Sequence, residues 1–385
     1  MADLGIAGKV NNWLAGSRFD AVIAAGFDNV QYLSGALLPF APYRTDQVVA
    51  VVWPRRGQPV LVCPEEWRTT AEKTTWLGQA RGYVAESDGI SDAIGAMREI
   101  VPAGKIGVDA LRMSQRLFDA LSAALPNASL IGCDDELRAL RMVKTPAEIE
   151  LLVEAADRTD HSINACIHHV TVDRPRSELT LAEEIRVHCM ERLLDYRGYQ
   201  AASQVSCGET PGRLWYGAPK YGYSSIKAPE PLDAVQIHTR QSLDGYWSDA
   251  ARIMTMGEPT AAQTQTYNGL TSVRKMILRD LVPGVRCQDV FRTVVNEAAE
   301  AGIPLQAEYG LGHGIGVAAS EPPFLTDWDD TEIAPGMVLV LSPVVEDPSG
   351  RLLQAKDTVV MTAAGAKLVG WYRDWRTPYV PIASI

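Results

Sequence analysis

Short apolar runs alternate with amphipathic stretches along the first third of the chain. Residues 90–101 and 114–124 carry apolar positions at helical spacing, whereas the other runs are short, continuous and typical of buried strands. The strand-type runs are FDAVIAAG (19–26), VQYLSG (30–35), QVVAVVWP (47–54), QPVLVCP (58–64) and KIGVDA (105–110). This alternation predicts an α/β fold for the first third.

Longer elements begin near residue 144. Thr145 and Glu148 have the spacing of a capping box, with Pro146 at the first helical position, so a long helix is expected to follow. The same signal predicts helices that begin at Thr180 and at Thr260.

The second part of the chain groups its strands apart from its long helices. A further helix is predicted over residues 287–301, and strands are predicted over 234–241, 245–257, 337–345 and 357–365. We therefore predict an α/β domain at residues 1–144 and an α+β domain at residues 145–385.

The composition narrows the function classes. The 385 residues include 36 Lys and Arg against 47 Asp and Glu, a net charge of −11, so no surface for nucleic acid or anionic membranes is expected. No apolar run approaches the ~20 residues that cross a bilayer, and the N-terminus lacks a secretory signal pattern. Six widely spaced cysteines without a CxxC pair predict reduced, buried thiols and a cytoplasmic protein.

Few side chains stand out as candidates for chemistry. His313 lies in EYGLGHGIG, where glycines let the backbone approach an imidazole closely, and His238 lies in the middle of a predicted strand. Asp249, in a second predicted strand, is either functional or a partner for Arg252 three positions on. Glu321 precedes two prolines, and an acid on a rigid loop indicates function more than one on a helix surface does.

The order of five segments resembles the pita-bread family of creatinase, prolidase and aminopeptidase P. The segments are LRALRMVKTPAEIELLVEAA (137–156), DGYWSDAARIMTMGEPT (244–260), GLGHGIGVAASEPPFL (310–325), IAPGMVLVLSP (333–343) and AKDTVVMT (355–362). They cover almost the whole chain in the family's order. The resemblance implies a creatinase-type α/β N-terminal domain before an α+β pita-bread catalytic domain.

The resemblance also implies where the family's metal ligands would lie. Metal-dependent members use two Asp, one His and two Glu. Asp249 and His313 match two of these positions, whereas His238, Ser342 and Lys356 stand at the other three. An ammonium group ~4 Å from two divalent ions would cost several kcal/mol even at a screened dielectric. We therefore expect no dinuclear metal site and no cofactor.

On this basis we expect a metal-independent, creatinase-like hydrolase that cleaves a C–N bond in a small polar amidine, guanidino or amide substrate, or else a lyase. His313 would act as general acid and base, His238 as a second proton carrier, and Asp249 would orient an imidazole or activate water. Lys356 would stabilise an oxyanion, and Glu321 is a further catalytic candidate.

The expected substrate-binding residues are Arg44, Trp215, Tyr221 and Ser342. Ser342 would be a nucleophile only beside an imidazole. The resemblance implies a homodimer in which the N-terminal domain of one copy closes the site of the other, so we expect Arg44 to reach a substrate carboxylate in its partner.

Two alternatives stay open at the level of sequence. His238, Asp249 and His313 together make two imidazoles and one carboxylate, the ligand set of a site for one divalent ion. A non-catalytic binding protein that keeps the fold is the second alternative.

Overall fold

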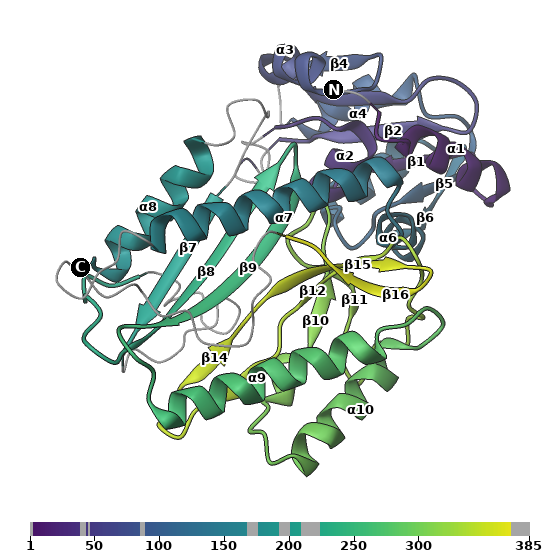
Figure 1. The fold of residues 1–385 in the computed structure, drawn as a ribbon. Helices are drawn as coiled ribbons and strands as arrows, with labels where there is room; N and C mark the ends of the chain where they lie inside the picture. The colour runs from purple at the N-terminus through teal and green to yellow at the C-terminus, as the bar shows by residue number, and fades with distance from the viewer. Residues whose placement is uncertain are drawn as a thin grey trace. The chain divides into compact units, whose positions relative to one another are not determined.

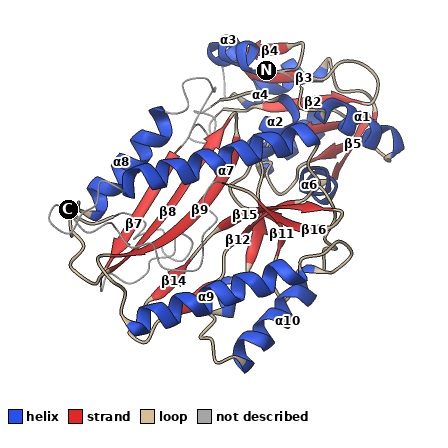
Figure 2. Cartoon of the chain, in the orientation of Figure 1, coloured by secondary structure: helices blue, strands red, loops and turns tan. Residues whose placement is uncertain are grey.

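The protein is described by a computed structural model that covers residues 3–38, 44, 47–84, 89–167, 176–191, 201–208 and 224–370. The chain separates into two compact units, Met1–Arg141 and Met142–Ile385. Figures 1 and 2 show their elements, and each unit is described by itself.

Unit 1 is built on a six-stranded sheet. Its strands are β1 (Ala21–Ala24), β2 (Ala50–Pro54), β3 (Val60–Pro64), β4 (Ala80–Tyr83), β5 (Gly104–Val108) and β6 (Ala128–Gly132). Its helices are α1 (Ile6–Gly16), α2 (Phe27–Ser34), α3 (Glu65–Thr74), α4 (Ile90–Arg98), α5 (Gln115–Ala124) and α6 (Asp134–Met142). The strand order is β4-β3-β2-β1-β5-β6, with β1 parallel to β5 and antiparallel to β2.

Residues 30–35 do not form the predicted strand. They lie in α2 and at its end, where Gly35 has a φ of 63°, the left-handed conformation that glycine adopts readily after a helix. Val30 and Leu33, three positions apart, are buried on this helix. The prediction was wrong because a short apolar run is equally compatible with a buried strand and with one face of a short helix.

The described residues of unit 2 form long helices and three sheets. Its helices are α7 (Pro146–Ile167), α8 (Glu178–Glu191), α9 (Ala261–Asp280), α10 (Cys287–Glu300) and the 3₁₀ helix η2 (Ala307–Tyr309). Its strands are β7 (Ala201–Cys207), β8 (Ala234–Leu243), β9 (Tyr246–Thr255), β10 (Gly312–Gly314), β11 (Glu321–Phe324), β12 (Val338–Leu341), β13 (Val344–Glu346), β14 (Leu352–Gln354), β15 (Asp357–Thr362) and β16 (Gly365–Leu368).

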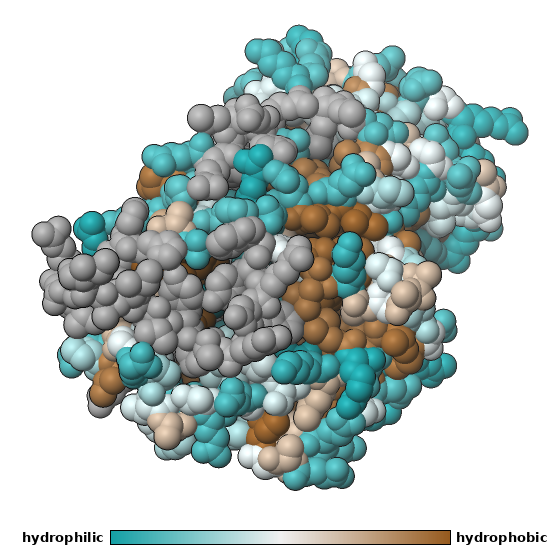
Figure 3. Space-filling view, in the orientation of Figure 1, coloured by the Kyte–Doolittle hydropathy of each residue, from teal (hydrophilic) through white to brown (hydrophobic). Residues whose placement is uncertain are grey.

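The sheets of unit 2 have the orders β7-β8-β9, β11-β10-β12-β15-β16 and β13-β14. A bridge between Ala251 and Lys356 links β9 to the residue that precedes β15. Apolar side chains of α7 and α8 form a core with β7–β9, and those of α9 and α10 form a second core with the five-stranded sheet. Figure 3 shows apolar residues gathered on one face between α7 and α9.

Local capping explains where these helices begin. Thr145 and Glu148 exchange hydrogen bonds of 3.2 and 2.8 Å as the predicted capping box, and Thr260 does the same with Gln263. The predicted start at Thr180 is wrong, because α8 begins earlier and the Ser177 hydroxyl accepts the Thr180 N–H at 3.1 Å. In the described part of the chain, no helix is long and apolar enough to cross a membrane.

All six cysteines lie in the described residues, where they are buried and form no disulfide. Burial raises the pKa of the thiols of Cys63, Cys207 and Cys287 to about 12 and that of Cys189 to about 11. It also raises the pKa of Cys133 above its ordinary value of 9.0. The thiol pKa is 9.0 in the unfolded chain and higher in the folded protein. Each such thiol therefore contributes its full stabilisation below pH 9, and this contribution is lost as the pH rises from 9 toward the pKa of the folded protein.

We therefore expect the free energy of unfolding to fall steeply above pH 9, by about 1.4 kcal/mol per pH unit for each such thiol. Lys356 opposes this trend, because its pKa is lowered by burial to about 8 and its stabilising contribution grows as the pH rises from 8 to 10.5. Urea unfolding in reductant between pH 7 and 10.5 measures the net effect. Stability that stays constant to pH 10.5 would contradict the prediction.

Candidate active site

A hairpin of β8 and β9 carries three polar side chains on one face. Asp244 and Gly245 at its turn have φ values of 45° and 85°, as in the two-residue turns that suit hairpins. The register pairs Arg240 with Asp249 and His238 with Ala251. Because side chains alternate along a strand, His238, Arg240 and Asp249 point to the same side of the sheet.

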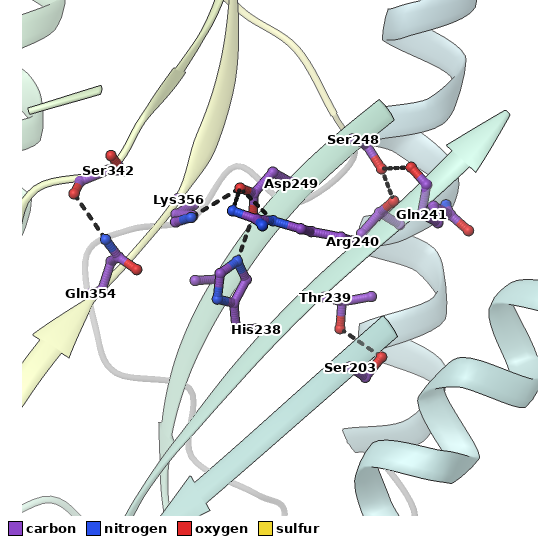
Figure 4. Close-up of polar contacts among 12 residues, drawn as sticks. Ser203, His238, Thr239, Arg240, Gln241, Ser248, Asp249, Ser342, Gln354 and Lys356 are labelled. Carbon is purple, nitrogen blue, oxygen red and sulfur yellow. Dashed lines mark hydrogen bonds and ion pairs between the residues drawn. The ribbon is translucent and has the colours of Figure 1, made fainter. Parts of the chain in front are cut away.

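The Asp249 carboxylate is the centre of a buried cluster (Figure 4). Its Oδ1 lies 2.5 Å from Nε2 of His238. Its Oδ2 accepts hydrogen bonds from Nε and Nη2 of Arg240 at 3.0 and 2.9 Å and from Nζ of Lys356 at 2.9 Å. Lys356 directly precedes β15, and its backbone N–H donates to the Ala251 carbonyl at 3.2 Å. We call His238, Arg240, Asp249, His313 and Lys356 the Asp249 cluster.

His313 joins the cluster from β10. Its Nδ1 lies 3.0 Å from the Gly314 carbonyl, which assigns the ring proton to Nδ1. Its Nε2 then lies 3.7 Å from Oδ2 of Asp249. The imidazole is therefore oriented by the backbone, and its unprotonated nitrogen lies near the same oxygen as the Lys356 ammonium.

The two residues beside His313 are glycines because no larger side chain fits there. A Cβ on Gly312 would lie 2.5 Å from the Val340 carbonyl oxygen, and one on Gly314 would lie 2.4 Å from the Pro322 carbonyl oxygen. Real Cβ atoms do not approach backbone so closely, so β10 fits between β11 and β12 only with glycine at these positions.

Gly314→Ala is accordingly expected to reduce the free energy of unfolding by about 1–3 kcal/mol, because backbone must move to admit the methyl group. Gly95→Ala in α4 is the matched control, since a Cβ there meets no atom within 4 Å. Urea unfolding of both variants measures the difference. A Gly314→Ala protein as stable as the control would refute this explanation.

Burial and neighbouring charges set the protonation states. Burial alone would raise the pKa of Asp249, but Lys356 and Arg240 hold it well below its usual value. Burial and the Lys356 charge lower the pKa of His238 to about 3 and that of His313 to about 4. Burial lowers the pKa of Lys356 to about 8. At neutral pH the cluster holds a carboxylate, two neutral imidazoles, a guanidinium and mostly an ammonium.

The cluster does not fit the divalent metal ions that this fold family implies. Asp249 is its one carboxylate, and Arg240 and Lys356 both donate to its Oδ2. Nε2 of His238 donates its proton to Oδ1 of Asp249, so this nitrogen has no lone pair for a metal ion. Within the residues that the structure describes, no three His, Cys, Asp or Glu side chains are placed to hold a metal ion. The arrangement therefore also gives no support to the single-ion alternative at His238, Asp249 and His313.

Two further site candidates have other contacts. The Glu321 carboxylate accepts a hydrogen bond from Lys144 at 3.0 Å, and both side chains are buried. The Ser342 carbonyl accepts from Gln354 at 3.1 Å, and no imidazole contact of its hydroxyl is found in the described residues (Figure 4). The catalytic role of Glu321 and the substrate-binding role of Ser342 stay predictions.

The remaining substrate-binding candidates lie elsewhere. Arg44 is exposed in unit 1, where it lines a cavity of that unit. Its reach into a partner's site stays a prediction, since a single chain is described. Trp215 and Tyr221 lie outside the described residues.

The pairing of Asp249 with Arg252 is wrong. Residues three apart on a strand point to opposite faces, and Arg252 instead binds Asp160 and lies 3.3 Å from Asp357. Sequence reasoning missed Arg240 as the true partner. The Asp244-Gly245 turn was the signal, because a two-residue turn places residue 240 opposite residue 249.

Comparisons with known proteins bear on both units. The Creatinase/Prolidase N-terminal domain model matches residues 8–143, and the Metallopeptidase family M24 model matches residues 150–363. The chain is similar to the Xaa-Pro dipeptidase of Pyrococcus horikoshii (25% identical over 234 residues, 61% of this chain and 64% of that protein). It is also similar to "Probable dipeptidase PepE" of Mycobacterium tuberculosis (26% over 374 residues, 95% of this chain and 90% of that protein).

The fold is similar to that of the X-Pro aminopeptidase of Thermotoga maritima, with a TM-score of 0.76 at 20% identity over 94% of this chain and 97% of that one. These matches confirm the predicted family resemblance and the two-domain creatinase/prolidase architecture.

The predicted function and cofactor are corrected by the same findings. A metal-independent, creatinase-like hydrolase without cofactor is wrong as a prediction, because the matching model is that of a metallopeptidase family and the relatives are named dipeptidases. The resemblance was right, but creatinase was the wrong member from which to infer the chemistry. With 214 of its 385 residues matched (150–363), the chain belongs to metallopeptidase family M24.

Proposed function

We propose that this protein is a hydrolase that cleaves a peptide-type C–N bond in a dipeptide or a similarly small amide. The observation that carries the proposal is the Asp249 cluster, in which a neutral imidazole and an ammonium group approach one carboxylate oxygen. The family and the names of its dipeptidase relatives support the reaction class.

The residues of the cluster suit acid–base chemistry on an amide. Nε2 of His313 accepts a proton from water while the water oxygen bonds to the amide carbon. The carbonyl electron pair moves to its oxygen, and the Lys356 ammonium stabilises the resulting oxyanion. The intermediate then expels the amine, which takes the proton from the imidazolium of His313.

The carboxylate supports both partners. Asp249 stabilises the imidazolium that forms on His313 and fixes the position of Lys356 at 2.9 Å. Arg240, which donates twice to the same carboxylate, holds Asp249 in place and acts as a positioning residue. The family is one of metallopeptidases, whereas the described residues of the Asp249 cluster do not fit a divalent ion, so the steps above involve side chains alone.

The test is a panel of dipeptides, with and without proline, and N-acetyl amino acids incubated in H₂¹⁸O. Hydrolysis releases a free amine and places ¹⁸O in the new carboxylate. An amine released without ¹⁸O would indicate elimination and overturn the proposal. Binding without turnover across the panel would support a non-catalytic member instead.

Two further properties belong to the same proposal. A homodimer is one, and light scattering that shows a monomer would count against it. A location in the cytoplasm is the other, supported by six cysteines that form no disulfide. Fractionation of cells that express the full protein tests it.

A further inference from the structure

Unit 1 contains a cavity of about 340 Å³ that is separate from the residues of the Asp249 cluster. It is lined by the residues that directly follow β1, namely Ala25, Gly26 and Phe27, and by Arg112, Met113 and Ser114, which lie between β5 and α5. The cavity therefore opens beyond the carboxyl ends of two parallel neighbouring strands.

The topology of the sheet explains the cavity. From the central strand β1, the chain builds β2, β3 and β4 on one side and β5 and β6 on the other. The connections after β1 and β5 therefore run in different directions and leave a crevice between them. Ligands of open α/β sheets bind in such crevices, and their usual volume is ~300–1,000 Å³.

Among the residues that the structure describes, the charged side chains of the lining are those of Arg44 and Arg112, with Gln31, Gln47 and Ser114 as polar neighbours. Arg112 donates to Asp28 at 3.1 Å, and Asp28 also accepts from Arg141 at 2.7 Å. Two guanidinium groups thus share one carboxylate, so this group of three side chains carries one net positive charge.

Two further acids lie beside the lining residues without lining the cavity themselves: Glu66 accepts a hydrogen bond from Gln47 at 3.3 Å, and Asp109 lies behind the loop after β1. Asp109 is fully buried, and its carboxylate accepts hydrogen bonds from the N–H groups of Ala25 and Gly26 and from the amide of Asn29. The Asp109 carboxylate therefore fixes the position of the loop after β1.

The rest of the lining is apolar. It includes Val30, Leu38, Val48, Ile90 and Leu117. A ligand that suits this surface carries one anionic group for Arg112 and a short hydrocarbon chain for the apolar side chains.

We propose that the cavity of unit 1 binds a small aliphatic carboxylate. The carboxylate is held by Arg112, and the hydrocarbon chain packs on the aliphatic side chains. This site is independent of the proposed hydrolase reaction.

Isothermal titration of the full-length protein with hexanoate tests the proposal. We expect saturable 1:1 binding that weakens at least about tenfold in Arg112→Met, because the charge-assisted hydrogen bond is lost. Hexanamide, which has the same chain without the charge, is expected to bind at least about tenfold more weakly to the unmodified protein. Arg138→Met, an exposed arginine of α6 in the same unit, is the matched control and should leave the affinity unchanged.

Three results would overturn the proposal. The first is no binding of hexanoate, and the second is equal binding by Arg112→Met or of hexanamide. The third is binding that Lys356→Met abolishes, which would place the ligand at the Asp249 cluster instead. Since Arg112 is half exposed, Arg112→Met is expected to fold, and a matching unfolding curve confirms it.

Discussion

Asp249→Ala is expected to lower the free energy of unfolding by about 3–5 kcal/mol, because it removes the carboxylate to which two buried cations donate. Arg240 would keep its positive charge in the interior without a counter-ion, and Lys356 would lose the carboxylate that raises its pKa. The same variant is expected to lose at least about a thousandfold in hydrolysis, since His313 loses the charge that stabilises its imidazolium and Lys356 loses its anchor.

Two control variants separate the two effects. Asp249→Asn keeps the shape and one acceptor, so it should lose less stability than Asp249→Ala while still losing most activity. Asp330→Ala removes an exposed acid of the same unit and should change neither. Urea unfolding and initial rates measure the four proteins. An Asp249→Ala protein as stable as Asp330→Ala would mean that the cluster is not the buried charge centre described above.

The second large effect concerns metal affinity. The resemblance implies five ligand positions, of which three hold His238, Ser342 and Lys356. In a variant with His238→Asp, Ser342→Glu and Lys356→Glu, we expect the affinity for Mn²⁺ to rise at least about a thousandfold over the unmodified protein. One unit charge at ~4 Å is worth about 4 kcal/mol at the effective dielectric of such sites, and each 1.4 kcal/mol is a factor of ten.

Lys356→Met is the intermediate in this series. It removes the ammonium without adding a carboxylate, so its affinity should lie between those of the unmodified protein and the triple variant. Calorimetric titration with Mn²⁺ gives the three values. Equal affinities in all three would show that these positions do not determine how this member of the family handles metal.

Local signals predicted much of the fold. The capping boxes at Thr145 and Thr260 depend on residues three apart, so the sequence alone locates the starts of α7 and α9. The strand predicted at residues 30–35 was wrong because a buried strand and the buried face of a short helix can both give a short apolar run. The ion pair of Glu321 with Lys144 joins residues 177 positions apart, and no local pattern indicates such a partner.

The sequence identified most residues of the Asp249 cluster but not all of the contacts between them. His238, Asp249, His313 and Lys356 were singled out, the last through the resemblance alone, and the structure brings these four together. Arg240 was missed although the hairpin turn fixes its place opposite Asp249. The predicted reaction was wrong because the loss of three metal-ligand residues does not by itself show which reaction a member of the family catalyses.

The most direct test of the proposed function is kcat/KM for the best dipeptide of the panel in the unmodified protein, in Lys356→Met and in the control Lys275→Met, an exposed lysine of α9. If the Lys356 ammonium stabilises the oxyanion, Lys356→Met loses at least about a hundredfold while Lys275→Met matches the unmodified protein. Equal values of kcat/KM in all three proteins would contradict the assignment of the reaction to the Asp249 cluster.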